Sequence, residues 1–458
     1  MLRRVRDTEL NMQTNFSLAQ LLDPQTAASE KILRTCVHCG FCTATCPTYV
    51  LLGDEDDSPR GRIYLIKEML EQAKPATREV VKHIDRCLSC MACMTTCPSG
   101  VHYMHLVDHG RDHIEKTYKR PLADRFIRGL LARVLTNPAK FRLAVTMGLI
   151  ARPFAPVFDV IGFKRVAAML RLTPHRKPAP PVERTGKVYP AQGERRGRVA
   201  LLSGCINPVL APSTDEAAIR LLNRHGIEVV VAAGEACCGS LVHHMGREAE
   251  AFAFARNDID AWTREIEGEG LDAILTTVSG CGMTIKDYGF MLRTDEAYAR
   301  KAARVSELAK DVSEFLAALE IAPVNGPRGL TVAYHSACSL QHGQNIVREP
   351  KDLLAKAGFT VKDIPEGHIC CGSAGTYNIL EPALAAGMQA RKLANIESVK
   401  PDVIAAGNIG CITQIAAGTG IPVVHTVELI DWATGGPMPE ALAELMAGKM
   451  DEAAALTA

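Results

Sequence analysis

The C-terminal half of the chain alternates apolar runs typical of buried strands with segments whose apolar residues recur at helical spacing. Between residues 198 and 281 the pattern predicts strands at 198–205, 227–233 and 272–281 and helices at 215–226 and 250–266. The same order returns further on, with predicted strands at 330–338, 359–364 and 402–411 and helices at 349–358 and 382–398. Strands that alternate with helices predict α/β units with mainly parallel sheets.

The first third of the chain is dominated by helical spacing. Residues 61–73 and 76–86 carry apolar residues at this spacing and are predicted helices. Residues 119–177 hold thirteen Lys and Arg against two acids, with apolar residues mostly on one helical stripe. Such a segment could pack on the protein's own core, dock a partner subunit or lie on an anionic membrane surface. Residues 174–197 are basic and rich in proline, which is typical of a linker.

The overall charge is close to zero, because the 458 residues include 52 Lys and Arg and 51 Asp and Glu. A general nucleic-acid-binding protein would carry a large basic excess, so no nucleic-acid partner is expected. No run of 18 apolar residues is free of charge, so no membrane-spanning helix is predicted. The basic N-terminus lacks an apolar core of the signal-peptide type, which favours a cytoplasmic location.

Sixteen cysteines change this picture, because they fall into four groups of four. In a reducing compartment, clustered cysteines indicate metal or redox sites rather than disulfides. The groups lie at positions 36, 39, 42 and 46; 87, 90, 93 and 97; 205, 237, 238 and 281; and 338, 370, 371 and 411.

The first two groups share the spacing C-x2-C-x2-C-x3-C-P, which is typical of bacterial two-cluster ferredoxins. Three thiolates at three-residue steps can ligate one cubane, and the fourth then ligates the other cluster. Two zinc sites are the competing interpretation, but zinc does not need the third cysteine of each motif. We predict one [4Fe-4S] cluster on Cys36, Cys39, Cys42 and Cys97, and a second on Cys87, Cys90, Cys93 and Cys46.

The last two groups are copies of each other. Cys205, Cys237 and Cys238 recur 133 residues later as Cys338, Cys370 and Cys371, and Cys281 recurs 130 residues later as Cys411. Such offsets indicate a duplicated domain of about 130 residues. The cysteines follow predicted strand ends, where open α/β sheets bind ligands, so both groups are candidate ligands of further clusters. A thiol–disulfide site and buried inert thiols are the alternatives.

The Cys-Cys-Gly repeats resemble the CCG domains of heterodisulfide reductase subunits, lactate-utilisation proteins and the anaerobic glycerol-3-phosphate dehydrogenase small subunit. Together with a two-cluster domain, the stretches CVHCGFCTATCPTY, SPRGRIYLIKEML, SGCGMTIKDYG and HICCGSAGTYN most closely resemble the glycolate oxidase iron–sulfur subunit. One departure is that the fullest CCG pattern ends C-x-x-C, whereas here Thr284 and Gln414 take the last position. Four thiolates remain in each copy, and four can hold a cluster.

We therefore predict a multidomain α+β protein with an N-terminal helical ferredoxin-like domain and two duplicated α/β CCG domains with mainly parallel sheets. The predicted boundaries are a partly disordered N-terminal extension at 1–28, the ferredoxin-like domain at 29–118, a basic helical segment and Pro-rich linker at 119–197, and CCG domains at 198–326 and 327–458.

The chain has no dinucleotide, P-loop or flavin fingerprint, so neither flavin nor nicotinamide is expected in it. Oxidation of a 2-hydroxy acid needs such a cofactor, whereas iron–sulfur clusters pass single electrons, so no catalytic residue is predicted here. The resemblance implies an electron-transfer subunit of a glycolate oxidase (glycolate dehydrogenase) complex. It would relay electrons from FAD-containing subunits that form glyoxylate towards quinone or another acceptor, at the inner face of the cytoplasmic membrane. A relay for lactate or glycerol 3-phosphate oxidation and a heterodisulfide-reductase-like enzyme are the alternatives.

Overall fold

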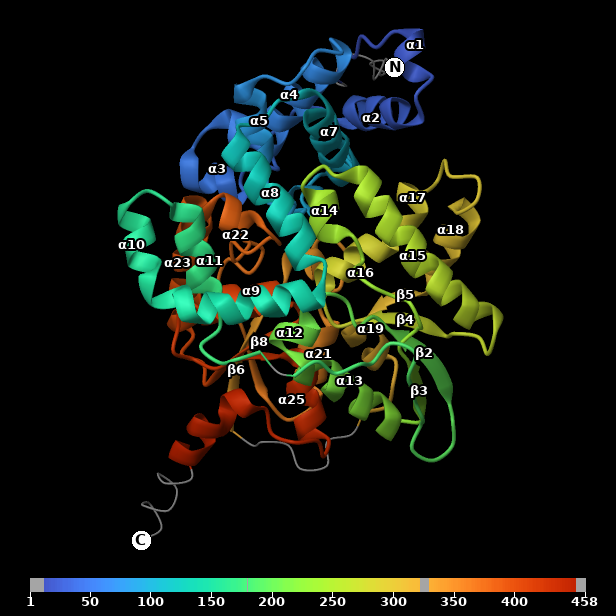
Figure 1. Cartoon of the computed structure of the whole chain (residues 1–458), viewed down its shortest axis with the longest axis vertical. Helices are drawn as coiled ribbons and strands as arrows, with labels where there is room; N and C mark the ends of the chain where they lie inside the picture. The colour runs from blue at the N-terminus through green and yellow to red at the C-terminus, as the bar shows by residue number, and fades with distance from the viewer. Residues whose placement is uncertain (1–11, 179, 322–328, 450–458) are drawn as a thin grey trace, which may run out of the picture. The chain divides into compact units, whose positions relative to one another are not determined.

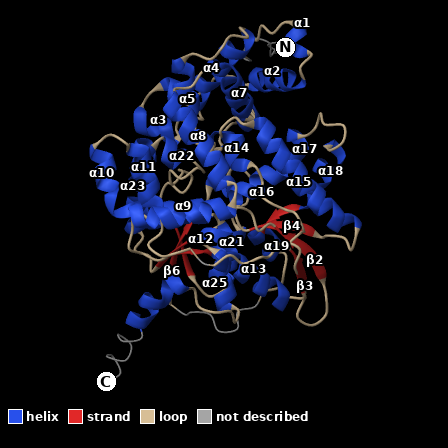
Figure 2. Cartoon of the chain, viewed as in Figure 1, coloured by secondary structure: helices blue, strands red, loops and turns tan. Residues whose placement is uncertain are grey.

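The computed structural model describes residues 12–178, 180–321 and 329–449 (Figure 1). The chain divides into two compact units. The first runs up to Arg128 and also contains Val242–Ala249, and the second contains Gly129–Leu241 and the chain from Glu250 onwards. All the strands that the structure describes lie in the second unit, and the first unit is helical (Figure 2).

The first unit is built from short helices around an apolar core. Leu33, Ile66, Ile84 and Leu106 are fully buried in that core. Capping side chains begin several helices; Ser58, for example, accepts from the Gly61 N–H at the start of α4. The helices are α1 (Leu18–Leu21), α2 (Pro24–Thr35), α3 (Pro47–Leu52), α4 (Pro59–Glu71), α5 (Arg78–Asp85), α6 (Ala92–Thr95) and α7 (Tyr103–Thr117), with a 3-10 turn at Glu55–Asp57. The predicted helices at 61–73 and 76–86 correspond to α4 and α5.

The described part of the predicted N-terminal extension belongs to this unit. The Met12 N–H donates to the Cys36 carbonyl oxygen at 3.0 Å, and the Met12 side chain is buried. The Gln20 side chain donates to the Leu70 carbonyl oxygen of α4 at 3.1 Å. Residues 12–28 therefore pack against the ferredoxin-like core, and the disorder expected for residues 1–11 lies outside the described residues.

The second unit contains two sheets that repeat one topology. The first has the order β1-β3-β2-β4-β5 and the second β7-β6-β8-β9. Only the β1–β3 pair is antiparallel among these neighbours, so the prediction of duplicated, mainly parallel α/β domains is confirmed. The strands are β1 (Val188–Tyr189), β2 (Gly197–Leu201), β3 (Ile227–Val230), β4 (Ala273–Thr276), β5 (Ala309–Asp311), β6 (Thr331–His335), β7 (Thr360–Asp363), β8 (Val403–Ala406) and β9 (Val423–His425).

Helices alternate with these strands in both copies. The first copy has α12 (Asn207–Leu210), α13 (Pro212–Arg224), α14 (Ser240–His244), α15 (Glu248–Glu267), α16 (Ser279–Lys286), α17 (Tyr288–Met291), α18 (Ala299–Leu308) and α19 (Val312–Ala317). The second has α20 (Cys338–Gln341), α21 (Glu349–Lys356), α22 (Tyr377–Leu380), α23 (Pro382–Ser398), α24 (Ile409–Ala416), α25 (Thr426–Ala433) and a 3-10 turn at Glu440–Leu442.

All six predicted strands are shorter than expected, and in two of them the difference changes the place of a cysteine. The strands predicted at 272–281 and 402–411 end at Thr276 and Ala406 as β4 and β8. Cys281 and Cys411 instead lie in the first turns of α16 and α24. For α24 the cause is local, because the Asn408 side chain caps the helix by accepting from the Gly410 N–H at 2.8 Å.

The two copies share one continuous apolar core. Val199 and Leu275 of the first sheet and Val332 and Val403 of the second are all fully buried in the same cluster. Polar contacts join the copies as well. Asp431 of α25 is buried and pairs with Arg220 and Arg224 of α13 at 2.7 and 2.6 Å.

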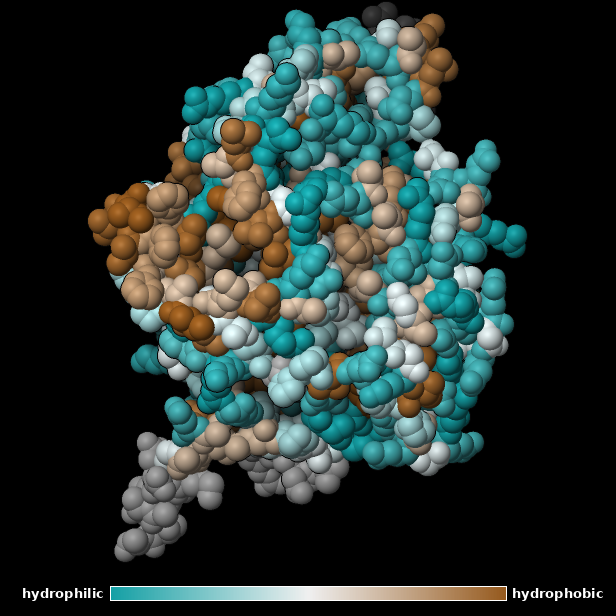
Figure 3. Space-filling view, in the orientation of Figure 1, coloured by the Kyte–Doolittle hydropathy of each residue, from teal (hydrophilic) through white to brown (hydrophobic). Residues whose placement is uncertain are grey.

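The basic segment forms helices α8 (Leu122–Leu135), α9 (Pro138–Ala151), α10 (Ala155–Val160) and α11 (Lys164–Leu172), with a 3-10 turn at Arg152–Phe154. One side of this segment packs on the two duplicated α/β domains of the second unit, which we call the CCG unit. The Arg142 guanidinium donates to the Pro208 carbonyl oxygen, and Arg165 donates to that of Leu380. The other side exposes a group of large apolar residues, which we call the α9–α11 apolar surface (Figure 3): Leu143, Met147, Ile150, Phe154, Val157, Val160, Ile161 and Phe163.

Within the described residues, the stretch Pro138–Val160 is long and apolar enough to cross a membrane by length and composition alone. It did not meet the charge-free criterion because four charged residues interrupt it, namely Lys140, Arg142, Arg152 and Asp159. Only 17% of its most apolar window is buried. The stretch is broken by a 3-10 turn, and its buried face packs on the CCG unit, so length and composition do not by themselves make it a membrane span.

We expect Asp431→Ala to destabilise the CCG unit, because it leaves Arg220 and Arg224 without their buried partner. Removing one member of a fully buried pair costs about 3–5 kcal/mol, and we expect about 2 kcal/mol here because Arg220 is 39% exposed and screened by solvent. The apparent melting temperature, followed by far-UV circular dichroism, should fall by about 2–4 °C.

The matched control is Glu307→Ala, which removes the exposed Arg304–Glu307 pair and should leave the melting temperature almost unchanged. Equal effects of the two substitutions would contradict the role given to Asp431.

Candidate iron–sulfur sites

The two ferredoxin-type loops share one backbone conformation. His38 and Gly40 in the first loop have positive φ angles, and Ser89 and Met91 do so at the equivalent positions of the second. Residues other than glycine rarely adopt this conformation, which costs about 1–2 kcal/mol per residue. Its recurrence at matching positions indicates that each sequence motif folds into the same ligand-presenting loop.

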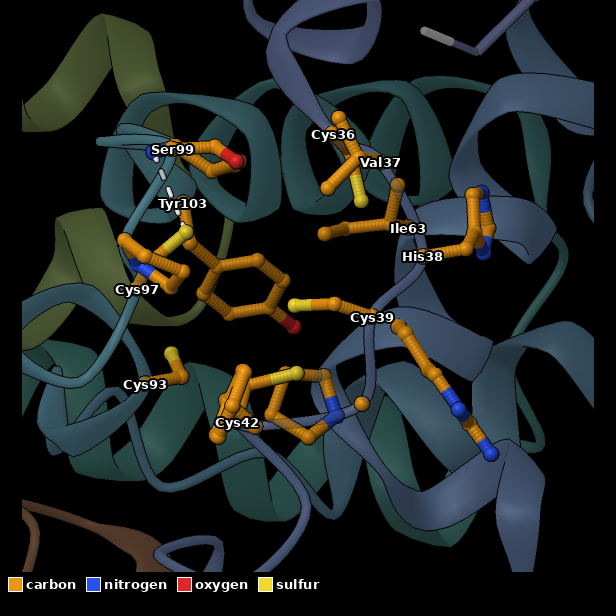
Figure 4. A pocket seen from close by; sticks show the side chains of 16 residues that line it. Cys36, Val37, His38, Cys39, Cys42, Ile63, Cys93, Cys97, Ser99 and Tyr103 are labelled. Atoms are coloured by element: carbon orange, nitrogen blue, oxygen red, sulfur yellow. Dashed lines mark hydrogen bonds between the residues drawn. The ribbon is translucent and has the colours of Figure 1, made fainter. Parts of the chain in front are cut away.

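The thiols of Cys36, Cys39, Cys42 and Cys97 line one pocket of the first unit, and Cys93 reaches the same pocket (Figure 4). Burial raises the pKa of Cys36, and negative charge on Cys97 and Cys39 adds to this effect. The fourth cysteine of the second motif thus lies beside the thiols of the first. We call these four residues the first cluster set.

Cys46 lies with the thiols of the second motif. It is the N-cap residue of α3 and is followed by Pro47 at the first helical position. Burial raises the pKa of Cys93 well above its ordinary value, and charge on Cys90, Cys87 and Cys46 raises it further. Cys46, Cys87, Cys90 and Cys93 form the second cluster set. Ligation by both sets stays a prediction.

The chemistry of the two sets fits iron–sulfur clusters. Burial raises the pKa of Cys42 to about 11, so a thiolate there requires nearby positive charge, which iron ions supply. Donors also face the sulfurs: the Val101 N–H lies 3.5 Å from Cys97 Sγ, and the Tyr103 hydroxyl lies 3.7 Å from Cys87 Sγ. Such hydrogen bonds tune the potential of a cluster.

Arg62 is a contributor that the cysteine pattern did not indicate. Its side chain is buried, and its Nη1 lies 3.7 Å from Cys46 Sγ. The guanidinium also donates to the His83 carbonyl oxygen at 2.7 Å and pairs with the buried Asp57 at 3.2 Å. A buried cation beside the second set favours the more negative, reduced state of a cluster there. The one sequence signal was that Arg62 lies in the stretch SPRGRIYLIKEML, which carries the family resemblance.

In the first CCG copy, Cys205, Cys237 and Cys238 are buried, and Cys281 is half-buried in the first turn of α16. Hydrogen bonds from Cys205 and Cys238 lower the pKa of Cys237 to about 4. Donating this hydrogen bond to Cys237 raises the pKa of Cys205, and charge on Cys281 adds to this effect. The four thiols of this copy therefore lie together, as candidate ligands should.

The second copy repeats this arrangement. Cys338 Sγ lies 3.5 Å from Cys370 Sγ, and a hydrogen bond from Cys371 is the main cause that lowers the pKa of Cys411 to about 6. Gly372 follows the cysteine pair with φ +90°, and a Cβ there would lie 2.5 Å from the Ala385 carbonyl oxygen. Only glycine allows this approach, which explains the third residue of the Cys-Cys-Gly motif.

The surroundings of the two CCG sites differ in charge. In the first copy the buried Asp258 accepts from the Ala236 N–H at 2.8 Å, and burial raises its pKa to about 7. In the second copy the buried side chain is Lys392, whose Nζ donates to the Glu366 carbonyl oxygen at 3.0 Å. The charges of Cys371, Cys370 and Cys338 act on Lys392, so thiolates are better compensated in the second copy. Periodicity of the sequence could not predict this difference.

Two interleaved thiol sets in a helical unit, followed by duplicated Cys-Cys-Gly sites, define an iron–sulfur protein with several redox centres. The model of the 4Fe-4S dicluster domain matches residues 32–101, and that of the cysteine-rich domain matches residues 199–286 and 332–416.

The chain is 44% identical to the glycolate oxidase iron–sulfur subunit of Escherichia coli (strain K12) over 92% of its own length and 99% of that protein. It is 30% identical to the probable glycolate oxidase iron–sulfur subunit of Bacillus subtilis (strain 168), over 88% of this chain and 94% of the relative. Lactate utilization protein A of Bacillus licheniformis is 25% identical over 51% of this chain and 99% of that protein. The chain belongs to the family of glycolate oxidase iron–sulfur subunits.

We expect Cys97→Ser to damage the cluster of the first set, although Cys97 belongs to the second sequence motif. Low-temperature EPR of the reduced full chain should lose or change one [4Fe-4S] signal and keep the other. Cys46→Ser is the matched variant and should damage the other signal. If Cys97→Ser and Cys93→Ser affected the same cluster, cross-ligation would be wrong.

Proposed function

We propose that the chain relays electrons from an FAD-containing partner that oxidises glycolate to glyoxylate towards quinone or another acceptor. Identity to a named glycolate oxidase iron–sulfur subunit over nearly the whole of both chains carries this proposal. Oxidation of glycolate releases two electrons and two protons. A flavin can take the pair as a hydride, and bound clusters would then pass the electrons on one at a time.

The exposure of the thiols supports an electron-exchange role for the first cluster set. Cys39 is exposed, whereas Cys36 is buried. Beside it, Phe41 is 64% exposed, which gives an apolar contact for a partner surface. The first cluster set thus has a buried side at Cys36 and reaches the surface of the protein at Cys39. A partner that docks over Cys39 would come close to the bound cluster.

The experiment is an anaerobic pull-down of the full chain from its native host, with flavin and partner chains identified. We expect an FAD protein in the complex and dye reduction that depends on glycolate. L-lactate and glycerol 3-phosphate serve as parallel substrates, because lactate utilization protein A is also similar to this chain. Dye reduction with only L-lactate or only glycerol 3-phosphate would show that the substrate of the complex is not glycolate. A flavin-free chain that reduces disulfides would contradict the relay function and favour a thiol-reducing enzyme.

We also propose that the protein is cytoplasmic and lies peripherally on the inner face of the cytoplasmic membrane, through the α9–α11 apolar surface. This surface exposes Ile150, Phe154 and Phe163 to solvent. Along the chain it is flanked by the exposed Lys140 and Lys164. Apolar side chains flanked by basic ones match an anionic lipid surface, where each basic residue near the surface adds about 1 kcal/mol.

We expect the full chain to float with vesicles that contain phosphatidylglycerol and to remain unbound with phosphatidylcholine alone. Replacing Ile150, Phe154 and Phe163 together by Ser should reduce the bound fraction at least five-fold. The matched control replaces the exposed Val188 and Val347 by Ser and should leave binding unchanged. Equal loss in both variants, or no flotation of the wild type, would contradict membrane attachment through this surface.

A further inference from the structure

His335 has an unusual position in the second CCG copy. It is the last residue of β6, which lies between β7 and β8 in the sheet. Its side chain is 1% exposed, and its ring is hydrogen-bonded to the Cys411 thiol. A buried imidazole needs a polar partner, and here the cysteines of the second CCG site supply it.

The His335 ring points into the thiol site. One of its nitrogens, Cys371 Sγ and Cys411 Sγ all lie within 4.8 Å of one another. Metal–sulfur and metal–nitrogen bonds of about 2.0–2.3 Å bring the ligand atoms of one metal to such separations. The other two thiols of this copy also lie close together, with Cys338 Sγ 3.5 Å from Cys370 Sγ.

The first copy has no counterpart of this imidazole. The repeat offset of 133 residues pairs His335 with Leu202, an apolar residue that is also buried. Both copies lack the final cysteine of the fullest CCG pattern, and Gln414, which takes its place in the second copy, accepts a hydrogen bond from Asn378 at 3.0 Å. The second copy therefore offers five donor side chains and the first copy four.

We propose that the second CCG site is an imidazole–thiolate metal centre in which His335 is a ligand together with Cys371 and Cys411, and that the first site is ligated by thiolates alone. Cys338 and Cys370 supply the remaining sulfur ligands. Imidazole and thiolate together suit a zinc ion, and they also suit an iron–sulfur cluster with a histidine ligand. The inference goes beyond electron relay, because it concerns which metal each copy holds and through which atoms.

The first test compares His335→Ala with the matched variant Leu202→Ala in the anaerobically purified full chain. Iron and zinc are counted per chain. The wild type should hold metal beyond the about eight irons of two [4Fe-4S] clusters. His335→Ala should remove the share of this additional metal that the second site holds and keep the share of the first site, while the EPR signals of the two cubanes stay intact. Leu202→Ala should keep the full metal content, and His335→Cys should restore metal binding.

The second test needs no variant and covers the case in which His335→Ala fails to fold. The wild-type chain is labelled with 15N-histidine. If the centre contains iron, pulsed EPR of the reduced protein should show a nitrogen coupling that changes with the label. If it contains zinc, the extended X-ray absorption fine structure at the zinc edge should show scattering from an imidazole ring.

Additional metal that His335→Ala leaves undiminished, or a second centre with sulfur ligands only, would overturn the proposal. So would a chain with no metal beyond the two cubanes. None of these readouts depends on glycolate, so they leave the proposed relay function to be judged separately.

Discussion

A thiolate buried without a compensating cation is unfavourable, and much of this fold is arranged around that constraint. Eight of the sixteen thiols belong to the helical unit, where burial raises the pKa of Cys36, Cys42 and Cys93. Burial thus favours the protonated thiol, and a bound metal ion can favour the thiolate instead. The interleaving of the two cluster sets then has a structural consequence. Each cluster would tie the 36–46 loop to the 87–97 loop, so ligation and folding of this unit depend on each other.

In the duplicated half, the buried thiols of the two copies have different charged neighbours. Its two sheets share one core, so the copies behave as one folded body. The surroundings of their thiols have nevertheless diverged, with the acidic Asp258 near the first site and the basic Lys392 near the second. Different charge and different donors around equivalent cysteines are a direct way to obtain centres of different metal content or potential from one ancestral fold.

Much of this could be predicted from the sequence, because the relevant patterns are local and repeated. The spacing of Cys36, Cys39 and Cys42 and the offset between the Cys-Cys-Gly motifs require no knowledge of tertiary structure. The strands β1, β5 and β9 were missed because two or three residues are too few to show a period. The placement of Cys281 and Cys411 inside helices was missed as well, and for Cys411 the Asn408 cap is what begins the helix early.

The environment of each site could not be predicted in this way. His335 looks like part of an ordinary strand in the sequence, and only the sheet brings it beside Cys411. Arg62 likewise reaches Cys46 only through the packing of α4 against the loops. The α9–α11 apolar surface was expected as a stripe on a helix, but which of its residues remain exposed depends on the packing against the CCG unit.

The role proposed for this chain is to carry electrons that a flavoprotein partner takes from the substrate. The most direct measurement follows the EPR signals of its clusters after anaerobic addition of glycolate, with and without the FAD-containing partner. We expect glycolate to leave the clusters of the isolated chain oxidised and the partner to make their reduction rapid. Reduction of the isolated, flavin-free chain by glycolate would contradict a pure relay role.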